Sequence, residues 1–399
     1  MKIVHAIRSL AARIGGPPMV AINIAARQID AGHDVKLIYE DLGGELIRLP
    51  HQLTEDRLVM VPARTISSRL VDSDFSRIAE PVLDDADIIH VHGIWRRVPF
   101  RSMKFASSIG APFMISPHGM LNEWALQQNP MRKKAAFMMG TWNLIEKANG
   151  IHALSDYEYD CVKDHNLAAT LAKIPNGVDL TEIYPLPDPG SFRNKHPQLR
   201  QDGRDLPFIL FLARLHPGKR LDLLVEAFAM VAPNLPDLRL VVVGPDFGAQ
   251  ADLEARIQHH GLGDKVTLTG PIWGKDKFEP IVDATAYCLP SDHESFSVAI
   301  VEALACGCPA IISEECHFPE VRESKSGFIV KLDIDELAKA MHEMVINQTL
   351  RQQMSANARK LVEENYQWEI IATKLTAFYQ DLIKTRSVPQ SRNRQTLSA

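Results

Sequence analysis

Short β-type hydrophobic runs alternate with longer segments of helical periodicity along almost the whole chain. Apolar residues that recur every three to four positions indicate a helix, whereas a run of about four to eight apolar residues between turn signals indicates a buried strand. Strands that alternate with helices are typical of an α/β protein with a parallel sheet. The alternation stops in the region of residues 185–206 and then starts again, so the sequence predicts two doubly wound α/β domains of similar size.

The first half opens with a strand, a loop and a helix. The helix is predicted from about Pro17 to Ala31, because proline is tolerated at the first helical positions and Gly32 ends the pattern. The predicted strands of this half are Lys2–Ala6, Val35–Tyr39, Asp87–Val91, Phe113–Ile115, Gly150–Ala153 and Leu171–Ile174. In the second half a helix is predicted over Leu221–Val231, with strands at Phe208–Leu212, Leu238–Val243, Val266–Leu268, Ala286–Leu289 and Ala310–Ile312.

Prolines and charges with almost no apolar periodicity fill 185–206, which predicts an exposed linker. The predicted domains are therefore 1–184 and 207–366. A last helix over 367–385 carries an apolar stripe, and we expect that stripe to dock on the first domain. Its members are Trp368, Ile371, Leu375, Phe378 and Leu382. The polar residues 386–399 are predicted to be disordered.

Composition narrows the class of protein. The 399 residues carry a net charge of −5, which argues against a dedicated nucleic-acid binder. Five cysteines in so long a chain indicate no disulfide framework and favour a reducing compartment. The N-terminus lacks the apolar stretch of a signal peptide, and no run reaches the roughly 18 apolar residues of a spanning helix. We expect a cytoplasmic protein.

The sharpest local feature is the segment 292–307, which follows a predicted strand and opens a helix near Ser297. A helix start offers unpaired N–H groups and a positive dipole end, and both suit a phosphate. Glu302, over a turn into that helix, could accept hydrogen bonds from two ribose hydroxyls, and Glu294 would lie near the group attached to the phosphate. The alternative is that Glu294 is a capping residue and Glu302 belongs to a solvated helix face.

A second feature is the loop after the first strand of the second half, where Arg214 and Lys219 lie five residues apart. Loops at the carboxyl ends of strands line the ligand crevice of open α/β sheets. There the two cations could clamp a diphosphate, with the arginine bidentate and the lysine as a point charge. The alternative, exposed basic residues at a helix start, opposes the helix dipole.

Taken together, these motifs resemble those of the family-4, group-1 retaining glycosyltransferases, which have two Rossmann-like domains in the GT-B arrangement with an interdomain cleft. The Glu294-to-Glu302 spacing resembles that family's Glu-x7-Glu motif, and Arg214 with Lys219 resembles its diphosphate pair. Other matching segments, in order, are Gly15-Gly16, Ile174–Asp179 and Tyr366–Trp368. The chain departs from the family at Phe296-Ser297, where Phe-Gly is frequent, and at Gly218-Lys219-Arg220, where Glu-Lys-Gly is frequent.

The resemblance implies transfer of a sugar, with retention, from a nucleotide-diphosphate donor to a hydroxyl of a glycan or lipid-linked acceptor. It implies catalysis without a metal or cofactor, since cations and backbone amides would stabilise the leaving diphosphate. Glu302 would bind ribose, and Glu294 would orient the sugar. The base would lie near Pro271-Ile272. The implied donor-binding residues are Gly15, Gly16, Arg214, Lys219, Pro271, Ile272, Glu294, Ser295, Phe296, Ser297 and Glu302.

By the same resemblance His118, which follows a strand of the first half, would lie beside the donor sugar and donate or accept at a hydroxyl. His118 is thus a fourth candidate catalytic residue, with Glu294, Arg214 and Lys219. His92 competes for this role, and a histidine at either position could be purely structural.

Three Asp-x-Asp strings at 72–74, 85–87 and 333–335 stand in polar or helical context and are interpreted as solvated faces, so no metal site is predicted from them. The stretch 96–147 holds eight Lys and Arg against two Glu, a net charge of 8 − 2 = +6. It could touch an anionic membrane surface, bind an anionic acceptor or be an ordinary helix.

Two rival functions remain open. A nucleotide-sugar epimerase can share the two-domain architecture, and a binding protein that has lost catalysis would keep the donor site. A dehydrogenase is disfavoured, because no G-x-G-x-x-G follows the first strand.

Overall fold

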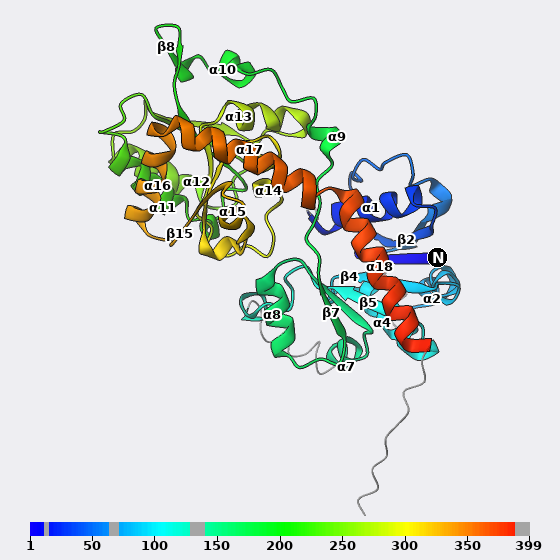
Figure 1. The fold of residues 1–399 in the computed structure, drawn as a ribbon. Helices are drawn as coiled ribbons and strands as arrows, with labels where there is room; N and C mark the ends of the chain where they lie inside the picture. Colours follow the sequence, from blue (N-terminus) through cyan, green and yellow to red (C-terminus); the bar gives the residue numbers. More distant parts are fainter. Residues whose placement is uncertain (12–15, 64–71, 128–139, 388–399) are drawn as a thin grey trace, which may run out of the picture. The chain divides into compact units, whose positions relative to one another are not determined.

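The computed structural model describes residues 1–11, 16–63, 72–127 and 140–387 (Figure 1). Its contacts divide the chain into two compact units. Unit 1 comprises residues 1–175 together with the chain from Trp368 onward, and unit 2 comprises Asn176–Gln367. Each unit contains a parallel sheet flanked by helices, so the prediction of two doubly wound α/β domains is confirmed.

Unit 1 contains a seven-stranded parallel sheet in the order β3-β2-β1-β4-β5-β6-β7. The strands are β1 (Lys2–Ile7), β2 (Asp34–Asp41), β3 (Leu58–Pro62), β4 (Ile88–His92), β5 (Phe113–Ser116), β6 (Gly150–Ala153) and β7 (Thr170–Lys173). Its described helices are α1 (Gly16–Asp30), α2 (Ser73–Ile78), α3 (Glu80–Asp84), α4 (Arg97–Ile109), α5 (Glu123–Gln127), α7 (Thr141–Glu146), α8 (Asp156–Asp164) and α18 (Trp368–Ser387), with a 3₁₀ turn at Glu55–Arg57.

The C-terminal helix α18 packs against α1 in unit 1. Its buried positions recur every three to four residues, so one face covers the core formed by β1, β2 and α1. Tyr379 is fully buried, whereas Phe378, placed on the stripe by the sequence, is only partly buried. The fully or almost fully buried residues of this face are Trp368, Ile371, Leu375, Tyr379 and Leu382.

Unit 2 contains a six-stranded parallel sheet in the order β12-β11-β10-β13-β14-β15. The strands are β10 (Phe208–Leu212), β11 (Arg239–Val243), β12 (Val266–Gly270), β13 (Ala286–Leu289), β14 (Ala310–Ser313) and β15 (Gly327–Val330), and a separate hairpin pairs β8 (Arg200–Gln201) with β9 (Arg204–Asp205). The helices are α9 (Leu180–Ile183), α10 (Ser191–Lys195), α11 (Leu221–Val231), α12 (Gln250–His259), α13 (Phe278–Asp283), α14 (Val298–Ala305), α15 (Glu320–Glu323), α16 (Ile334–Ile346) and α17 (Gln348–Asn365). Short 3₁₀ turns lie at Pro197–Leu199, Pro217–Lys219, Gly274–Lys277 and Glu314–Cys316.

Two strands of the parallel sheets, β3 and β15, are absent from the sequence prediction, as is the short hairpin β8–β9, and both β3 and β15 lie at a sheet edge. Each is only four or five residues long, so its apolar pattern is short. β15 also begins with Gly327, a residue depleted in strands. The structure requires glycine there, because a Cβ atom would lie 2.0 Å from the carbonyl oxygen of Ala310 on β14.

The prediction of a linker between domains over 185–206 is wrong, although most residues of this segment are exposed as predicted. Two apolar side chains of this segment lie in the core of unit 2. Phe192 is 1% exposed, and Leu199 is 0% exposed. The buried carboxylate of Asp283 on α13 accepts hydrogen bonds from the backbone N–H groups of Gly190 (2.6 Å) and Arg193 (3.1 Å). The segment is proline-rich but belongs to unit 2.

Gly15 and residues 388–399 of the predicted disordered tail lie outside the described residues. Within the described part of the chain, no helix is both long enough and apolar enough to span a membrane.

Candidate functional site

The two predicted motifs of unit 2 meet at the carboxyl edge of its sheet. β10 and β13 are neighbours in the sheet, and the loops that carry Lys219 and Glu294 follow them directly. The carbonyl oxygen of Gly218 accepts hydrogen bonds from the backbone N–H of Asp292 (2.9 Å) and the hydroxyl of Ser291 (3.1 Å). The structure therefore joins two motifs that are about 75 residues apart in sequence.

The loop after β10 is also held by the end of β11. A Cβ atom on Gly244 would lie 1.8 Å from the carbonyl oxygen of Ala213, so only glycine permits this close approach. The next residue, Arg214, is exposed, and its guanidinium carbon lies 5.2 Å from the ring centroid of Phe247. Among the ion pairs of the described residues, none involves Arg214, so its charge is available to an anion.

Lys219 and Glu294 form an ion pair, with side chains only 16% and 11% exposed. The backbone N–H of Glu294 donates to the carbonyl oxygen of Glu315 (3.0 Å), which holds the loop from the side of β14. Glu294 is not a capping residue, because Ser297 occupies the N-cap position of α14. The carboxylate is therefore held in place by its lysine partner and by the fixed loop backbone.

Glu302, on α14, pairs with Lys277 at 2.6 Å, and the glutamate side chain is only 15% exposed. The solvated-face alternative for Glu302 is therefore wrong. Sequence reasoning missed Lys277, which ends the 3₁₀ turn after β12. The available signal for Lys277 was a cation in a loop after a predicted strand. Its partner Glu302, however, lies 25 residues later in the sequence.

Helix α14 begins beside these carboxylates. Its N-cap residue Ser297 makes no side-chain capping bond, and the first N–H groups of a helix have no intrahelical partners. The ring of Phe296 packs near Phe318 and Tyr366, with centroid distances of 5.8 and 6.3 Å, and this packing anchors the loop. Pro271 and Ile272 follow β12 at the same edge of the sheet, where Pro271 is exposed and Ile272 packs on the core.

In unit 1, His118 follows β5 with a left-handed backbone (φ 52°). The next residue, Gly119, donates its N–H to the buried carboxylate of Glu158 (2.5 Å), which also accepts from the N–H of Leu154 (2.8 Å). Burial raises the pKa of Glu158 to about 7, although both backbone hydrogen bonds oppose this shift. Glu158 thus fixes the turn that carries His118.

The two competing histidines are directly bonded to each other. His92 Nδ1 lies 3.1 Å from His118 Nε2, and His92 Nε2 lies 3.0 Å from His5 Nδ1. His5 Nε2 in turn lies 2.8 Å from Gln28 Oε1. Burial lowers the pKa of His118 to about 3 and of His5 to about 4, and it lowers the pKa of His92 well below its usual value. The imidazoles are therefore neutral at pH 7.

A second chain of hydrogen bonds runs beside the first. His90 contacts the Tyr379 hydroxyl through Nδ1 (2.7 Å) and the Ser116 hydroxyl through Nε2 (2.6 Å). Ser116 also contacts His152 Nδ1 (2.6 Å), and His152 Nε2 donates to the carbonyl oxygen of Ile174 (2.6 Å). Sequence reasoning missed both chains, although histidines within apolar strands were a signal.

Three of these histidines, His5, His90 and His92, have ring nitrogens within 4.8 Å of one another. This is the one group of potential metal ligands found among the described residues. Both ring nitrogens of each histidine already have hydrogen-bond partners in the two chains. A metal ion would have to displace several of these bonds, so the donor set fits a hydrogen-bonded network better than a metal site.

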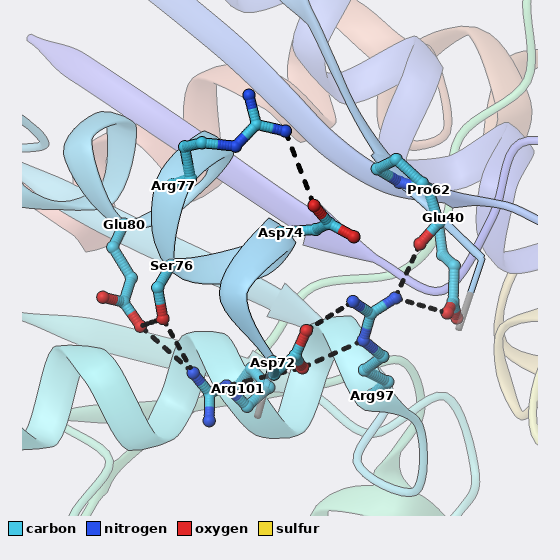
Figure 2. Close-up of polar contacts among 9 residues, drawn as sticks. All are labelled: Glu40, Pro62, Asp72, Asp74, Ser76, Arg77, Glu80, Arg97 and Arg101. Atoms are coloured by element: carbon cyan, nitrogen blue, oxygen red, sulfur yellow. Dashed lines mark hydrogen bonds and ion pairs between the residues drawn. The ribbon is translucent and has the colours of Figure 1, made fainter. Parts of the chain in front are cut away.

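The interpretation of 72–74 as a solvated face is wrong for Asp72. Arg97 donates to both carboxylate oxygens of Asp72, through Nε (3.0 Å) and Nη2 (2.5 Å), as Figure 2 shows. The same guanidinium also donates to Glu40 and to the carbonyl oxygen of Pro62, each at 2.8 Å. The Asp72 side chain is 4% exposed and that of Arg97 is 12% exposed, so this is a buried cluster in which Arg97 of α4 contacts both Asp72 and Glu40 near the end of β2.

The other two Asp-x-Asp strings also have structural partners. Asp85 pairs with the side chain of Lys2 (2.6 Å), and Asp87 accepts from the Lys2 backbone N–H (2.7 Å). Asp333 caps α16 by accepting from the N–H of Glu336 (3.0 Å).

We expect Arg97→Met to destabilise unit 1 by about 3–5 kcal/mol, because it leaves Asp72 buried without its partner. The exposed pair formed by Arg77 and Asp74 provides the control: Arg77→Met should change the free energy of unfolding by less than about 1 kcal/mol. Urea unfolding monitored by circular dichroism measures both values. Equal effects of the two substitutions would contradict the assignment of Arg97 to the core.

These ion pairs also reduce the number of cations in the basic stretch 96–147 that are free to contact an anionic surface. Arg97 is occupied by carboxylates, and Arg101 pairs with Glu80 (3.2 Å) and lies 3.8 Å from Asp72 (Figure 2). The basic run Arg132–Lys134 lies outside the described residues. Two of the cations counted from the sequence are therefore unavailable to an anionic surface.

Comparison with known proteins gives the class of this fold and site. The family model described as glycosyltransferase family 4 matches residues 14–182, and the model described as glycosyl transferases group 1 matches residues 192–361. The two matches cover both units, and the protein is a glycosyltransferase with the GT-B fold. The chain belongs to the family-4, group-1 glycosyltransferases, which confirms the resemblance drawn from its motifs.

Curated relatives support this membership. A phosphatidyl-myo-inositol mannosyltransferase of Mycobacterium leprae is 27% identical over 90% of this chain and 88% of its own. A GDP-mannose-dependent α-(1-6)-phosphatidylinositol monomannoside mannosyltransferase of Mycobacterium tuberculosis is 29% identical over 53% of this chain and 56% of its own. Among solved structures, Anabaena Alr3699/HepE in complex with UDP has a TM-score of 0.75 at 17% identity, over 96% of this chain and 100% of its own. That structural likeness supports the fold alone.

Proposed function

We propose that the protein transfers a hexose, with mannose from GDP-mannose as the first candidate, to a hydroxyl of a lipid-linked acceptor of the phosphatidylinositol type. The observation that carries the proposal is the junction in unit 2, where the Lys219–Glu294 pair and the exposed Arg214 lie on loops that follow adjacent strands. The names of the mycobacterial relatives supply the sugar and the acceptor class.

In this proposal Arg214 and Lys219 bind the diphosphate, together with the N–H groups of Phe296, Ser297 and the first turn of α14. The positive charges and the helix N-terminus stabilise the negative charge that develops on the leaving nucleotide. This stabilisation lets the reaction proceed without a metal, and the leaving phosphate assists deprotonation of the acceptor hydroxyl. The sugar retains its anomeric configuration, as in the family the motifs resemble.

The carboxylates have separate roles. Glu302 accepts from the ribose hydroxyls while Lys277 holds its other lone pairs, since an ionised carboxylate has about four acceptor sites. Glu294 orients the transferred sugar, and Pro271 with Ile272 contacts the base. His118 forms a hydrogen bond with a hydroxyl of the transferred sugar.

A membrane-embedded acceptor requires the protein to reach a lipid surface. We propose peripheral contact through exposed cations of the 96–147 stretch, with Arg97 and Arg101 excluded because carboxylates already hold them. The same amount of phosphatidylinositol should therefore be glycosylated faster in vesicles of anionic phosphatidylserine than in vesicles of neutral phosphatidylcholine, and high salt should reduce the difference.

The test is a transfer assay with the purified protein. GDP-mannose, UDP-glucose and UDP-N-acetylglucosamine are each offered with vesicles that contain phosphatidylinositol and with vesicles that lack it. We expect a glycosylated lipid from GDP-mannose only when phosphatidylinositol is present, with equal rates before and after exhaustive chelation. An altered nucleotide sugar formed without acceptor would support the epimerase instead, and activity that requires added Mg²⁺ or Mn²⁺ would refute metal independence.

Kinetics should separate the two glutamates. We expect Glu302→Ala to raise the donor KM about tenfold or more with little change in kcat, because ribose contacts are alike in ground and transition states. Glu294→Ala should lower kcat, since the carboxylate contacts the reacting sugar. Steady-state kinetics over a range of donor concentrations measures both, and matching profiles for the two variants would contradict these roles.

A further inference from the structure

Gln28, His5 and His92 form a hydrogen-bonded row that ends at His118. We propose that this row fixes the tautomer of His118. In that tautomer, Nδ1 of His118 accepts a hydrogen bond from a hydroxyl of the bound sugar. The proposal rests on the proposed function, because it takes His118 to contact the sugar. Gln28, His5 and His92 then act as positioning residues, and we call the four side chains the histidine relay.

The fold builds the relay from three neighbouring elements of unit 1 and the turn after β5 that carries His118. β1 and β4 are adjacent and parallel, with Ile7 opposite His92 in the register, and α1 supplies Gln28. His5 and Gln28 are fully buried, and His92 is 2% exposed. Buried polar groups at these positions must satisfy one another, which leaves each ring one arrangement of donor and acceptor.

Helix α18 sets the direction at the buried end. The Gln28 side-chain NH₂ group donates to the hydroxyl of Thr376 (3.4 Å), so the amide oxygen Oε1 is the atom that faces His5. An amide oxygen only accepts, and His5 must therefore carry its proton on Nε2. Because burial keeps His5 neutral, its Nδ1 has no proton and can only accept.

The same reasoning moves one ring at a time toward His118. His92 must donate from Nε2 to His5 Nδ1, and this leaves His92 Nδ1 as an acceptor. His118 must then donate from Nε2 to His92 Nδ1. The remaining nitrogen, His118 Nδ1, carries a lone pair and has no hydrogen-bond partner among the described residues. The direction of the hydrogen bonds in the relay thus makes Nδ1 of His118 an acceptor, and not a donor, toward a ligand.

This direction has a chemical consequence. A neutral imidazole that accepts from a sugar hydroxyl increases the electron density on that oxygen, which favours the positive charge that develops on the sugar ring as the nucleotide leaves. A His118 with its proton on Nδ1 would donate to the same oxygen and oppose that charge. The choice between the two tautomers therefore affects the transition state more than it affects donor binding.

The second chain of histidines supplies a matched control. Its proton order is also fixed, because the Ile174 carbonyl can only accept from His152 Nε2. Ser116 then donates to His152, His90 donates to Ser116, and Tyr379 donates to His90 Nδ1. The Ser116 hydroxyl contacts His90 and His152 but no member of the relay, so Ser116→Ala removes a buried hydroxyl of the second chain without removing a hydrogen bond of the relay.

The decisive measurement is the tautomer of His118 by NMR on protein labelled with ¹⁵N-histidine. Long-range ¹H–¹⁵N correlation distinguishes a protonated from an unprotonated ring nitrogen, and the His118→Asn variant identifies the His118 signals. We expect wild-type His118 to carry its proton on Nε2. Gln28→Met should give a mixture of both tautomers, and Ser116→Ala should leave the protonated nitrogen of His118 unchanged. A proton on Nδ1 in the wild type overturns the proposal.

Turnover supplies the second readout. We expect Gln28→Met to lower kcat by about 5- to 10-fold, the bias that one buried hydrogen bond gives to an equilibrium, with the donor KM changed by less than about twofold. Thr376→Val, at a partly exposed position, should act in the same direction if Gln28→Met fails to fold. An unchanged kcat and tautomer in both variants, or an equal loss in Ser116→Ala, overturns the proposal. Because the spectrum needs no substrate, failure of the transfer assay alone refutes the proposed function and not the relay.

Discussion

Removal of either cation from the loop after β10 should lower kcat by about 10²–10³-fold, the usual effect of losing one preorganised group that stabilises developing charge. Lys219→Ala removes the lysine that pairs with Glu294, and Arg214→Ala removes a cation that has no ion pair among the described residues. If the proposed diphosphate site is correct, both losses act on the same leaving group. The double variant should therefore lose less than the product of the two single losses.

Arg220→Gln is the matched control for this prediction, because Arg220 is the next residue in the loop but pairs with Asp222 (2.8 Å). It removes the same formal charge at almost the same place. We expect kcat of this variant to stay within about threefold of the parent, since the charge of Arg220 is already paired with Asp222 and its long-range effects are screened by salt. A similar loss of kcat in all three variants would show that net charge, and not a diphosphate site, determines activity. Parent-like activity of Lys219→Ala would also contradict the proposed diphosphate site.

The donor loops could be predicted because their signal is local. The strand Ala286–Leu289 is an uninterrupted apolar run, and the carboxylates and the helix start follow it within a few residues. The partner Lys277 could not be predicted in the same way. Its contact with Glu302 depends on the order β12-β11-β10-β13, which no local pattern specifies.

The buried histidines also show that contacts between residues distant in sequence cannot be predicted from a local pattern. His90 and His92 alternate along β4, so they lie on one face of the strand, and His5 pairs in register with His90. A polar ring repeated within apolar strands is a signal of a buried network that the sequence reasoning did not use. Its course could not be predicted, because Gln28 comes from α1 and Tyr379 from a helix almost 290 residues after β4.

The linker prediction failed for a related reason. Proline content indicates that a segment lacks regular structure, but it does not indicate exposure. Phe192 and Leu199 are too widely spaced to form a periodic pattern, and the carboxylate that binds the backbone on either side of Phe192 belongs to Asp283, on the distant helix α13.

Unit 1 should lose stability steeply between pH 6.5 and pH 5, whereas unit 2 should lose much less in that range. Burial holds the pKa of His5 and His152 at about 4 and of His118 at about 3, and it lowers the pKa of His90 and His92 well below the usual value. The unfolded chain has histidines with a pKa of about 6.5, so below that pH it binds protons that the folded unit does not. Their contribution to stability is complete above pH 6.5 and is lost as the pH falls toward 4.

The size of the effect follows from the number of groups. Each histidine changes the free energy of unfolding by at most about 1.4 kcal/mol per pH unit, so the five together give several kcal/mol per pH unit near pH 5.5. Glu158 acts in the opposite direction, because its raised pKa of about 7 gives a contribution that is present at low pH and lost as the pH rises from about 4.5 to 7. The contribution of one carboxyl group is smaller than that of five imidazoles, so the free energy of unfolding of unit 1 decreases as the pH falls.

Hydrogen exchange monitored by mass spectrometry at pH 7.0, 6.0 and 5.0, corrected for the intrinsic exchange rate, measures each unit separately. In unit 2, only His317 has a pKa lowered by burial to about 4, with a smaller lowering at His196 and His293. Unit 2 therefore serves as the internal control within the same molecule. Peptides from β1, β4 and β5 should lose protection at pH 5.0, while peptides from β10 and β13 keep it. Equal loss in both sheets would mean that carboxylates, and not the buried histidines, determine the acid stability of this protein.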